Sequence, residues 1–253
     1  MGPKYLVTIL VLLALAVSAS PAHASGVVSV CDEAHLRAAL AGGDTVTFSC
    51  SGTIILTSTI SIWNNATLDG TGQAVIISGN HAVRVFKVNS GVTLNLNRLT
   101  IANGGSGPGG NISGGGILNQ GSVTVNNSTF TGNHTGNGEG GGIYNASDGT
   151  VTVSNSIFSD NGASQGGGIT NDYGTVTVNN SIFSGNSSSN SGGGISNSSK
   201  MTVSNSTFSS NRAADGGGIS NSSSIELTVS NSTFAGNSAR FGGGIYNSSS
   251  VLT

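Results

Sequence analysis

The second half of this chain repeats one short pattern of glycine, isoleucine, valine, phenylalanine and asparagine. The tetrad Gly-Gly-Gly-Ile recurs at steps of 24 to 26 residues, and a phenylalanine recurs with a similar spacing. A period of this length, kept over half a protein, is typical of a solenoid, in which each repeat packs on the next. The isoleucines are Ile117, Ile143, Ile169, Ile195, Ile219 and Ile245. The phenylalanines are Phe130, Phe158, Phe183, Phe208 and Phe234.

Each repeat contains three short apolar runs, separated by glycines, serines and asparagines that make a helix unfavourable. In the first full repeat these runs end at Ile117, cover Val123 to Val125, and surround Phe130. Three strands and three turns in about 25 residues make one coil of a parallel β-helix. Alternate side chains point to opposite faces, so we expect the valines, isoleucine and phenylalanine inside and Thr124 outside. The next coil lies about 4.8 Å further on, so like side chains should stack.

Asparagines recur at two constant places in the repeat. One follows the isoleucine by two residues, and the other follows the phenylalanine by three. Stacked asparagine side chains can hydrogen-bond to one another along the axis, so both sets predict ladders. The first set is Asn119, Asn145, Asn171, Asn197, Asn221 and Asn247; the second is Asn133, Asn161, Asn186, Asn211 and Asn237. The triple glycine has two candidate causes: a backbone with positive φ, or a close approach of neighbouring backbones.

Residues 1–24 have the pattern of a secretory signal peptide. Lys4 supplies the positive charge, the apolar stretch from Leu6 to Val17 is too short to span a bilayer comfortably, and Ala22-His23-Ala24 is an A-x-A cleavage motif. We expect cleavage before Ser25; the alternative is an uncleaved membrane anchor. No later stretch has enough consecutive apolar residues to cross a membrane. The sequence therefore predicts a secreted or surface-located protein with no transmembrane segment after cleavage.

Residues 25–52 differ from the repeats and predict an N-terminal cap. Asp32 is the expected N-cap of a helix over residues 32–41, and Gly42 follows as its stop signal. A short amphipathic helix would cover the end of the β-helix, where the core would otherwise meet water. Cys31 and Cys50 are the chain's two cysteines and flank this helix. In an exported protein they should form a disulfide.

We expect the β-helix to run from residue 53 to residue 253 as one domain. Residues 53–104 predict two less regular coils, in which Ile101 takes the place of the phenylalanine. The glycine-rich residues 103–114 predict a loop on one side of the solenoid. The chain ends at Thr253, inside the expected next Val-Thr-Val strand, so we expect a fragment that lacks its C-terminal cap.

The repeat motifs resemble those of a known family. Tetrads such as Gly140-Gly141-Gly142-Ile143, paired with Phe158-Ser159-Asp160-Asn161, resemble the G-G-A-I and F-x-x-N repeats of the polymorphic outer membrane proteins. More broadly, the chain is similar to the pectin-lyase-like superfamily, and the segment from Cys31 to Cys50 resembles the N-terminal cap of bacterial surface β-helix proteins. The resemblance implies an all-β, single-stranded right-handed parallel β-helix. It also implies surface display, with possible outer-membrane association, and adhesion.

The composition fits an exported solenoid and argues against nucleic acid as a partner. The chain has 41 glycines, only 7% charged residues and a formal net charge of −2, so it offers no basic patch. A chain rich in glycine and serine can also be disordered. The regular spacing of the isoleucines, valines and phenylalanines argues against disorder, because disordered low-complexity chains lack a periodic apolar set.

Few residues of the repeats are candidates for chemistry. Asp148 and Asp172 follow the isoleucine strands of adjacent coils, where they are either solvated turn residues or part of a calcium or catalytic site. Glu139 and Asp160 lie in other turns. β-helix lyases and hydrolases place acidic residues beside an arginine or lysine. The repeats show no such cluster at positions that would lie over one another in successive coils. We therefore expect no catalytic residue and no cofactor, with calcium as the open alternative.

Aromatic side chains are the remaining candidates for ligand binding. Trp63, Tyr144, Tyr173 and Tyr246 are either platforms for sugars or isolated surface aromatics. We expect a carbohydrate or protein ligand at the cell surface or outside the cell. The sequence thus predicts a secreted or surface-displayed structural or adhesion protein without catalytic activity. The alternative is a carbohydrate-active lyase or hydrolase whose site lies outside the regular repeats.

Overall fold

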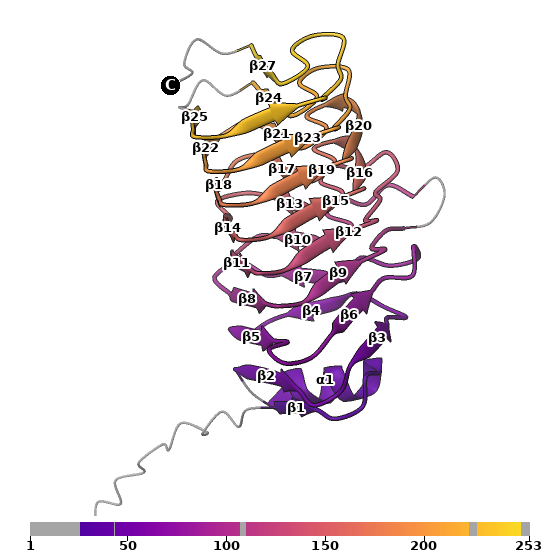
Figure 1. The fold of residues 1–253 in the computed structure, drawn as a ribbon. Coiled ribbons are helices and arrows are strands. Elements are labelled where there is room, and N and C mark those ends of the chain that lie inside the picture. Colours follow the sequence, from indigo (N-terminus) through magenta and orange to yellow (C-terminus); the bar gives the residue numbers. More distant parts are fainter. Residues whose placement is uncertain (1–25, 43, 107–109, 223–226, 249–253) are drawn as a thin grey trace, which may run out of the picture.

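The computed structural model describes residues 26–42, 44–106, 110–222 and 227–248, which wind into one elongated stack of coils (Figure 1). Each regular coil contributes one strand to each of three parallel sheets. The predicted all-β parallel β-helix is therefore confirmed. The expected signal peptide over residues 1–24, part of the expected 103–114 loop and the expected strand at residues 251–253 lie outside the described residues.

The valine sheet is formed by the Val-Thr-Val runs. Val123 lies opposite Val151 in the next coil, and Val125 lies opposite Val153. These valines are fully buried, whereas Thr124 between them is on the outer face. The strands are, in spatial order, β1 (Gly26–Val28), β2 (Thr45–Phe48), β5 (Ala66–Asp69), β8 (Thr93–Asn97), β11 (Ser122–Asn126), β14 (Thr150–Ser154), β18 (Thr175–Asn179), β22 (Lys200–Ser204) and β25 (Leu227–Ser230).

The isoleucine sheet is formed by the three residues that follow the triple glycine. Ile117 lies opposite Ile143 on one side and opposite Phe86 on the other. Its strands are, in spatial order, β4 (Ile60–Ile62), β7 (Phe86–Val88), β10 (Ile117–Asn119), β13 (Ile143–Asn145), β17 (Ile169–Asn171), β21 (Ile195–Asn197), β24 (Ile219–Asn221) and β27 (Ile245–Asn247). The strand β4 is the outermost strand at the N-terminal end of this sheet.

The phenylalanine sheet closes each coil. Its strands are β3 (Gly52–Ile55), β6 (Val75–Ser78), β9 (Thr100–Ala102), β12 (Thr129–Thr131), β15 (Ile157–Ser159), β19 (Ile182–Ser184), β23 (Thr207–Ser209) and β26 (Thr233–Ala235). The long turns after this sheet hold one further pair, β16 (Gly162–Gln165) and β20 (Ser187–Ser191). Ile101 lies opposite Phe130 on one side and Ile77 on the other, so isoleucines precede the phenylalanines in this column.

The phenylalanine rings form one continuous stack inside the solenoid. Neighbouring rings lie 4.7 to 4.9 Å apart and within 8° of parallel. The first four rings are fully buried, and Phe234 in the last described coils is partly buried. This spacing matches the distance between parallel strands, so the backbone ladder and the ring stack have the same repeat.

The asparagines form two buried ladders. In the first, the side-chain nitrogen of each asparagine donates to the side-chain oxygen of the next at 2.7 to 2.9 Å, from Asn119 to Asn247. In the second, the corresponding distances from Asn133 to Asn237 are all 2.9 Å. Most of these amides also donate to backbone carbonyls, as Asn161, Asn171 and Asn186 do, so these buried polar side chains have hydrogen-bond partners.

The triple glycine has both of the causes that the sequence left open. The first glycine of the motif needs a left-handed backbone, as at Gly166, where φ is +58°. The third glycine lets the backbone of the next coil and a phenylalanine ring approach closely. A Cβ on Gly168 would lie 2.6 Å from the carbonyl oxygen of Gly194 and 2.9 Å from the ring of Phe183. The glycines therefore let the backbone turn and let the phenylalanine ring pack directly against it.

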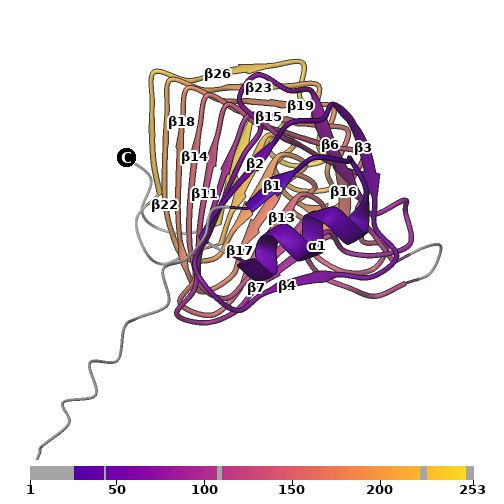
Figure 2. The same cartoon turned by 90° about the horizontal axis from the view of Figure 1, so that it is seen from below.

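The helix α1 (Glu33–Gly42) lies across the N-terminal end of the coils (Figure 2). It begins one residue later than the predicted 32–41 because Asp32 is its N-cap, whose carboxylate accepts from the backbone N–H of His35 at 2.8 Å. Gly42, expected to follow the helix, is instead its last residue. Leu36 is fully buried and Ala39 nearly so, so this face of the helix covers the core.

A disulfide joins Cys31, just before α1, to Cys50, after β2, as predicted. The two residues are 19 positions apart in the sequence, and their Cα atoms are 5.7 Å apart. Cross-linking this segment restricts the unfolded chain, so replacing both cysteines by serine is expected to cost about 3 kcal/mol of stability. The measurement is urea unfolding with and without reductant. A reductant effect that persists in the double variant would contradict this assignment.

Candidate functional site

A polar groove lies beside the isoleucine sheet, where the long turns of successive coils reach it. Its volume is about 310 Å³. The turns that precede β13 and β17 supply one wall, and the outer faces of these strands supply the floor. The lining residues are Asn111, Ser113, Asn137, Gly138, Glu139, Tyr144, Gln165, Thr170, Asp172 and Ser198. Because four coils contribute, the groove exists only in the wound chain.

Glu139 and Gln165 face each other across two coils of this wall. Both lie four residues before the isoleucine of their repeat, and the two residues form a parallel bridge. The Gln165 amide nitrogen donates to the Glu139 carboxyl at 2.9 Å. Burial, and then the negative charge of Asp172, raise the pKa of Glu139, while the hydrogen bond from Gln165 opposes that rise. Glu139 therefore holds its proton to higher pH than an ordinary glutamic acid.

Tyr144 and Asp172 form the second polar pair of the groove. Tyr144 is the middle residue of β13, so its side chain points away from the core, and its hydroxyl donates to the Asp172 carboxylate at 2.9 Å. Burial and the neighbouring Asp172 carboxylate raise the pKa of Tyr144 well above its ordinary value. Tyr144 thus remains a neutral hydrogen-bond donor throughout the physiological range.

The structure groups Asp172 with Glu139 and Tyr144, and it places Asp148 elsewhere. Asp148 lines a separate hollow with Gly121 and neighbouring residues, so the two aspartates do not share a pocket. The sequence placed Glu139 in another turn and did not group it with Asp172, because Glu139 lies before its isoleucine strand and Asp172 lies after the next one. The shared offset of Glu139 and Gln165 from their isoleucines was the available signal.

Arg84 is a residue near the groove that the sequence did not indicate. Its guanidinium is half-buried and donates to the carbonyl oxygens of Ser113, at 2.8 Å, and Gly114, at 3.0 Å. Burial lowers the pKa of Arg84, although an arginine stays charged in proteins. Because Ser113 lines the groove, Arg84 supports that wall from behind.

Calcium takes six to eight oxygen ligands, and the carboxylates that the groove offers are those of Glu139 and Asp172. In the part of the chain that the structure describes, no group of three or more histidine, cysteine, aspartate or glutamate side chains could hold a metal ion. Glu139 and Asp172 also each accept a hydrogen bond, from Gln165 and Tyr144, so donors occupy part of their oxygen surface.

The remaining aromatic candidates are scattered over the surface. Tyr173 is 71% exposed and Trp63 is 70% exposed. Tyr246 lies in the last described coil, where its ring is 6.2 Å from that of Phe241. These residues do not form one aromatic surface with Tyr144, which lies in the groove.

Comparisons with known proteins bear on the fold alone. The family model described as "Right handed beta helix region" matches residues 85–252. No curated protein and no solved structure matches the chain. The match covers most of the described coils, from the strand β7 onward.

Proposed function

Because the chain belongs to the right-handed beta helix family, we propose that it is a secreted or surface-displayed structural protein whose rigid rod serves as a stalk or adhesive surface. In this proposal the chain has no catalytic activity of its own and needs no cofactor. Its ligands are carbohydrates or proteins at the cell surface or outside the cell, and nucleic acid is not among them.

The observation that supports this proposal most directly is the unbroken register between coils. From β10 to β24 each coil repeats the strand ladders, and buried phenylalanine and asparagine columns run through the same coils. Bending the rod would separate the stacked rings and break the hydrogen bonds between buried amides of successive coils. Such a body suits a spacer or a display surface, because its length and direction are constant.

Three further features support export. The disulfide between Cys31 and Cys50 is compatible with an oxidising compartment. Residues 1–24 have the signal-peptide pattern, although they lie outside the described residues. Among the described residues, no helix has the length and apolar character needed to span a membrane.

The test is to locate the full chain, carrying an epitope tag after its last residue, in its source organism. The expected result is detection in the medium, or on intact cells as a signal that external protease removes, together with binding of the purified protein to host or neighbouring cells. Retention of the uncleaved chain inside the cell would overturn the proposal. A variant with Ala22 and Ala24 replaced by bulky residues is the matched control, because it removes the A-x-A cleavage motif.

One observation favours the alternative, a carbohydrate-active enzyme. Glu139, with its raised pKa, lies in the same groove as the Asp172 carboxylate, and carboxyl pairs of this kind divide acid and base roles. The test is turnover of a panel of neutral and acidic polysaccharides by the wild type. Activity that disappears in Glu139→Gln and Asp172→Asn but survives in Asp148→Asn would establish an enzyme. Absence of turnover on the whole panel is what the stalk proposal expects.

The raised pKa of Glu139 predicts how the stability of the protein depends on pH. As pH rises above 4.5, the ordinary pKa of a glutamic acid, the unfolded chain releases the Glu139 proton before the folded chain does. The folded state is then progressively destabilised by Glu139. The stability of Glu139→Gln relative to wild type should therefore rise from acid toward neutral pH, by less than about 1 kcal/mol because the group is partly exposed.

Urea unfolding across this pH range measures that difference. Asp148→Asn removes one carboxyl outside the groove and corrects for the change in net charge. A relative stability of Glu139→Gln that falls with rising pH would contradict the assigned direction.

A further inference from the structure

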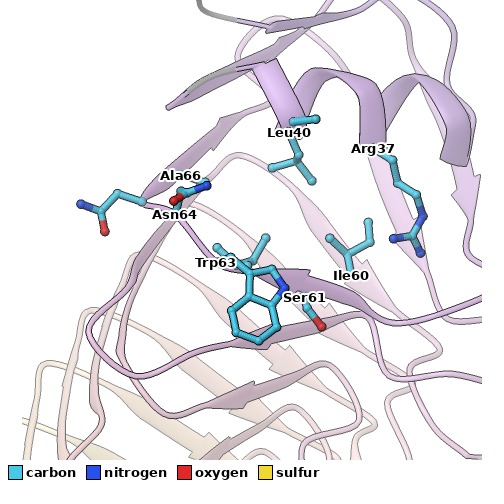
Figure 3. Close-up of a pocket in the computed structure, with 10 residues that line it drawn as sticks. Arg37, Leu40, Ile60, Ser61, Trp63, Asn64 and Ala66 are labelled. Atoms are coloured by element: carbon cyan, nitrogen blue, oxygen red, sulfur yellow. The ribbon is translucent and has the colours of Figure 1, made fainter. Parts of the chain in front are cut away.

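A second hollow lies at the N-terminal end, between the helix α1 and the outermost strand β4 (Figure 3). Its volume is about 240 Å³, somewhat less than the ~300–1,000 Å³ typical of sites for drug-sized ligands. The lining residues are Arg37, Leu40, Ala41, Ile60, Ser61, Ile62, Trp63, Asn64, Asn65 and Ala66. A cavity of this size suits a ligand of one or two sugar rings.

Trp63 gives the hollow an aromatic wall. It directly follows β4, and 70% of its surface is exposed although it is the largest apolar side chain of the region. The next coils carry polar residues, Asn89 and then Gln120, at the same turn position. An indole in a concave site offers a flat apolar face on which a ligand ring can stack.

The backbone edge of β4 gives the hollow polar groups as well. The N–H of Ile60 donates to Val85 and the carbonyl of Ile62 accepts from Asn89, so both residues direct these groups toward β7. In a parallel strand the next residue faces the opposite edge, so the backbone groups of Ser61 point to the α1 side, where the hollow lies. The Asn65 side-chain oxygen accepts from the backbone of Thr93 at 2.9 Å, which leaves its NH₂ group as a donor.

The charge at the rim argues for a neutral ligand. Arg37 lines the hollow, but its guanidinium forms an ion pair with Glu33 at 2.6 Å and also donates to Ser58 at 2.6 Å. Glu33 in turn accepts from Thr57, so this ion pair is part of a local network. An anionic ligand would have to compete with Glu33 for Arg37, whereas hydroxyl groups need only the amides and the strand edge.

We propose that this hollow binds a neutral saccharide, with a pyranose ring stacked on Trp63 and its hydroxyls bonded to Asn64, Asn65 and the Ser61 backbone. The combination of one aromatic face with several uncharged donors and acceptors matches a sugar, which has an apolar C–H face and a polar edge. The site lies between the helix of the N-terminal cap and β4, and it shares no lining residue with the groove of Glu139. The proposal therefore stands or falls independently of where the protein is displayed.

The test uses the intrinsic fluorescence of the full chain. Trp63 is the protein's single tryptophan, so selective indole excitation reports on this hollow alone. The probes are cello-, manno- and chito-oligosaccharides as neutral sugars, and polygalacturonate as the anionic comparison. The expected result is a saturable change with at least one neutral oligosaccharide and a weaker or absent change with polygalacturonate. No change with any neutral probe, or preference for polygalacturonate, would overturn the proposal.

Variants then test the role of the indole by calorimetry with the probe that binds best. Trp63→Ala should weaken binding at least tenfold, and Trp63→Phe should retain part of the affinity. Tyr173→Ala is the matched control, because Tyr173 is equally exposed and lies outside the hollow. Its affinity should equal that of the wild type. Because Trp63 is mostly exposed, Trp63→Ala should unfold at the wild-type midpoint; unchanged affinity in this folded variant would refute the site.

Discussion

Phe183→Ala is expected to lower the free energy of unfolding by about 3–5 kcal/mol. Phe183 is fully buried, and its ring lies between those of Phe158 and Phe208 at 4.8 Å on each side. Removing it leaves a cavity that the solenoid cannot close, because the strand ladders hold the neighbouring coils at constant spacing. The loss therefore combines the transfer free energy of a large side chain with two broken ring contacts.

Urea unfolding followed by circular dichroism measures this loss, and Thr177→Ala is its control. Thr177 belongs to the same coil but lies on the outer face of β18, so its replacement should cost well under 1 kcal/mol, about the effect of an ordinary surface substitution. Hydrogen exchange should show faster opening in the coils next to Phe183, because each coil of a solenoid contacts only its neighbours. Equal losses for the two variants would contradict the inward position of the ring.

Asn186→Ala is the second change expected to have a large effect, a loss of at least about 3 kcal/mol. The Asn186 side chain is fully buried. Its oxygen accepts from the backbone N–H and the side-chain amide of Asn161, and its nitrogen donates to the carbonyl of Phe158 and to Asn211. Alanine leaves the two Asn161 donors and the Phe158 carbonyl buried without partners, at about 1–3 kcal/mol each.

Asn179→Ala is the matched control for this ladder. The Asn179 side chain also bonds to the next coil, to Ser204 at 3.0 Å and Asn205 at 2.9 Å, but it is exposed. Water replaces those bonds, so we expect a loss below about 1 kcal/mol. A similar loss for both variants would show that burial does not matter to the ladder.

Asn186→Asp keeps the shape of the side chain but changes its hydrogen bonds, so it distinguishes the effect of packing from that of hydrogen bonding. A buried carboxylate has no proton for the Phe158 carbonyl and is costly to ionise, so its pKa should rise in the folded state. Stability of this variant should then fall as pH rises above about 4, the ordinary aspartate pKa. Stability that does not change with pH relative to wild type would show that the ladder position is open to solvent, and stability that rises with pH would show that the neighbouring donors stabilise the carboxylate.

The stacks could be predicted because the repeats are almost equal in length. If coils have nearly the same number of residues, Phe158 and Phe183 must lie over one another, whatever the path of the turns between them. The same argument placed the asparagines of both ladders and the outward Thr177. The register of the strands agrees with it from β8 to β25.

The groove and the hollow could not be predicted in this way. Glu139 lies before its strand and Asp172 lies after the strand of the next coil, so a constant offset does not relate them. Their proximity depends on how the long turn over residues 132–142 folds back toward the isoleucine sheet. In the same way, Trp63 lines a hollow only because α1 lies beside β4, and the two elements come from different parts of the cap and first coil.

The sequence by itself determined the periodic part of this protein: which side chains lie inside, which lie over one another, and where an amide must repeat. Those features follow from alternation along a strand and from the constant rise between coils, and both can be counted from residue numbers. Only the tertiary structure decided which carboxyl groups share a groove and which aromatic side chain lines a cavity. Those outcomes depend on the paths of irregular turns and on helix docking, where position in space no longer follows position in the repeat.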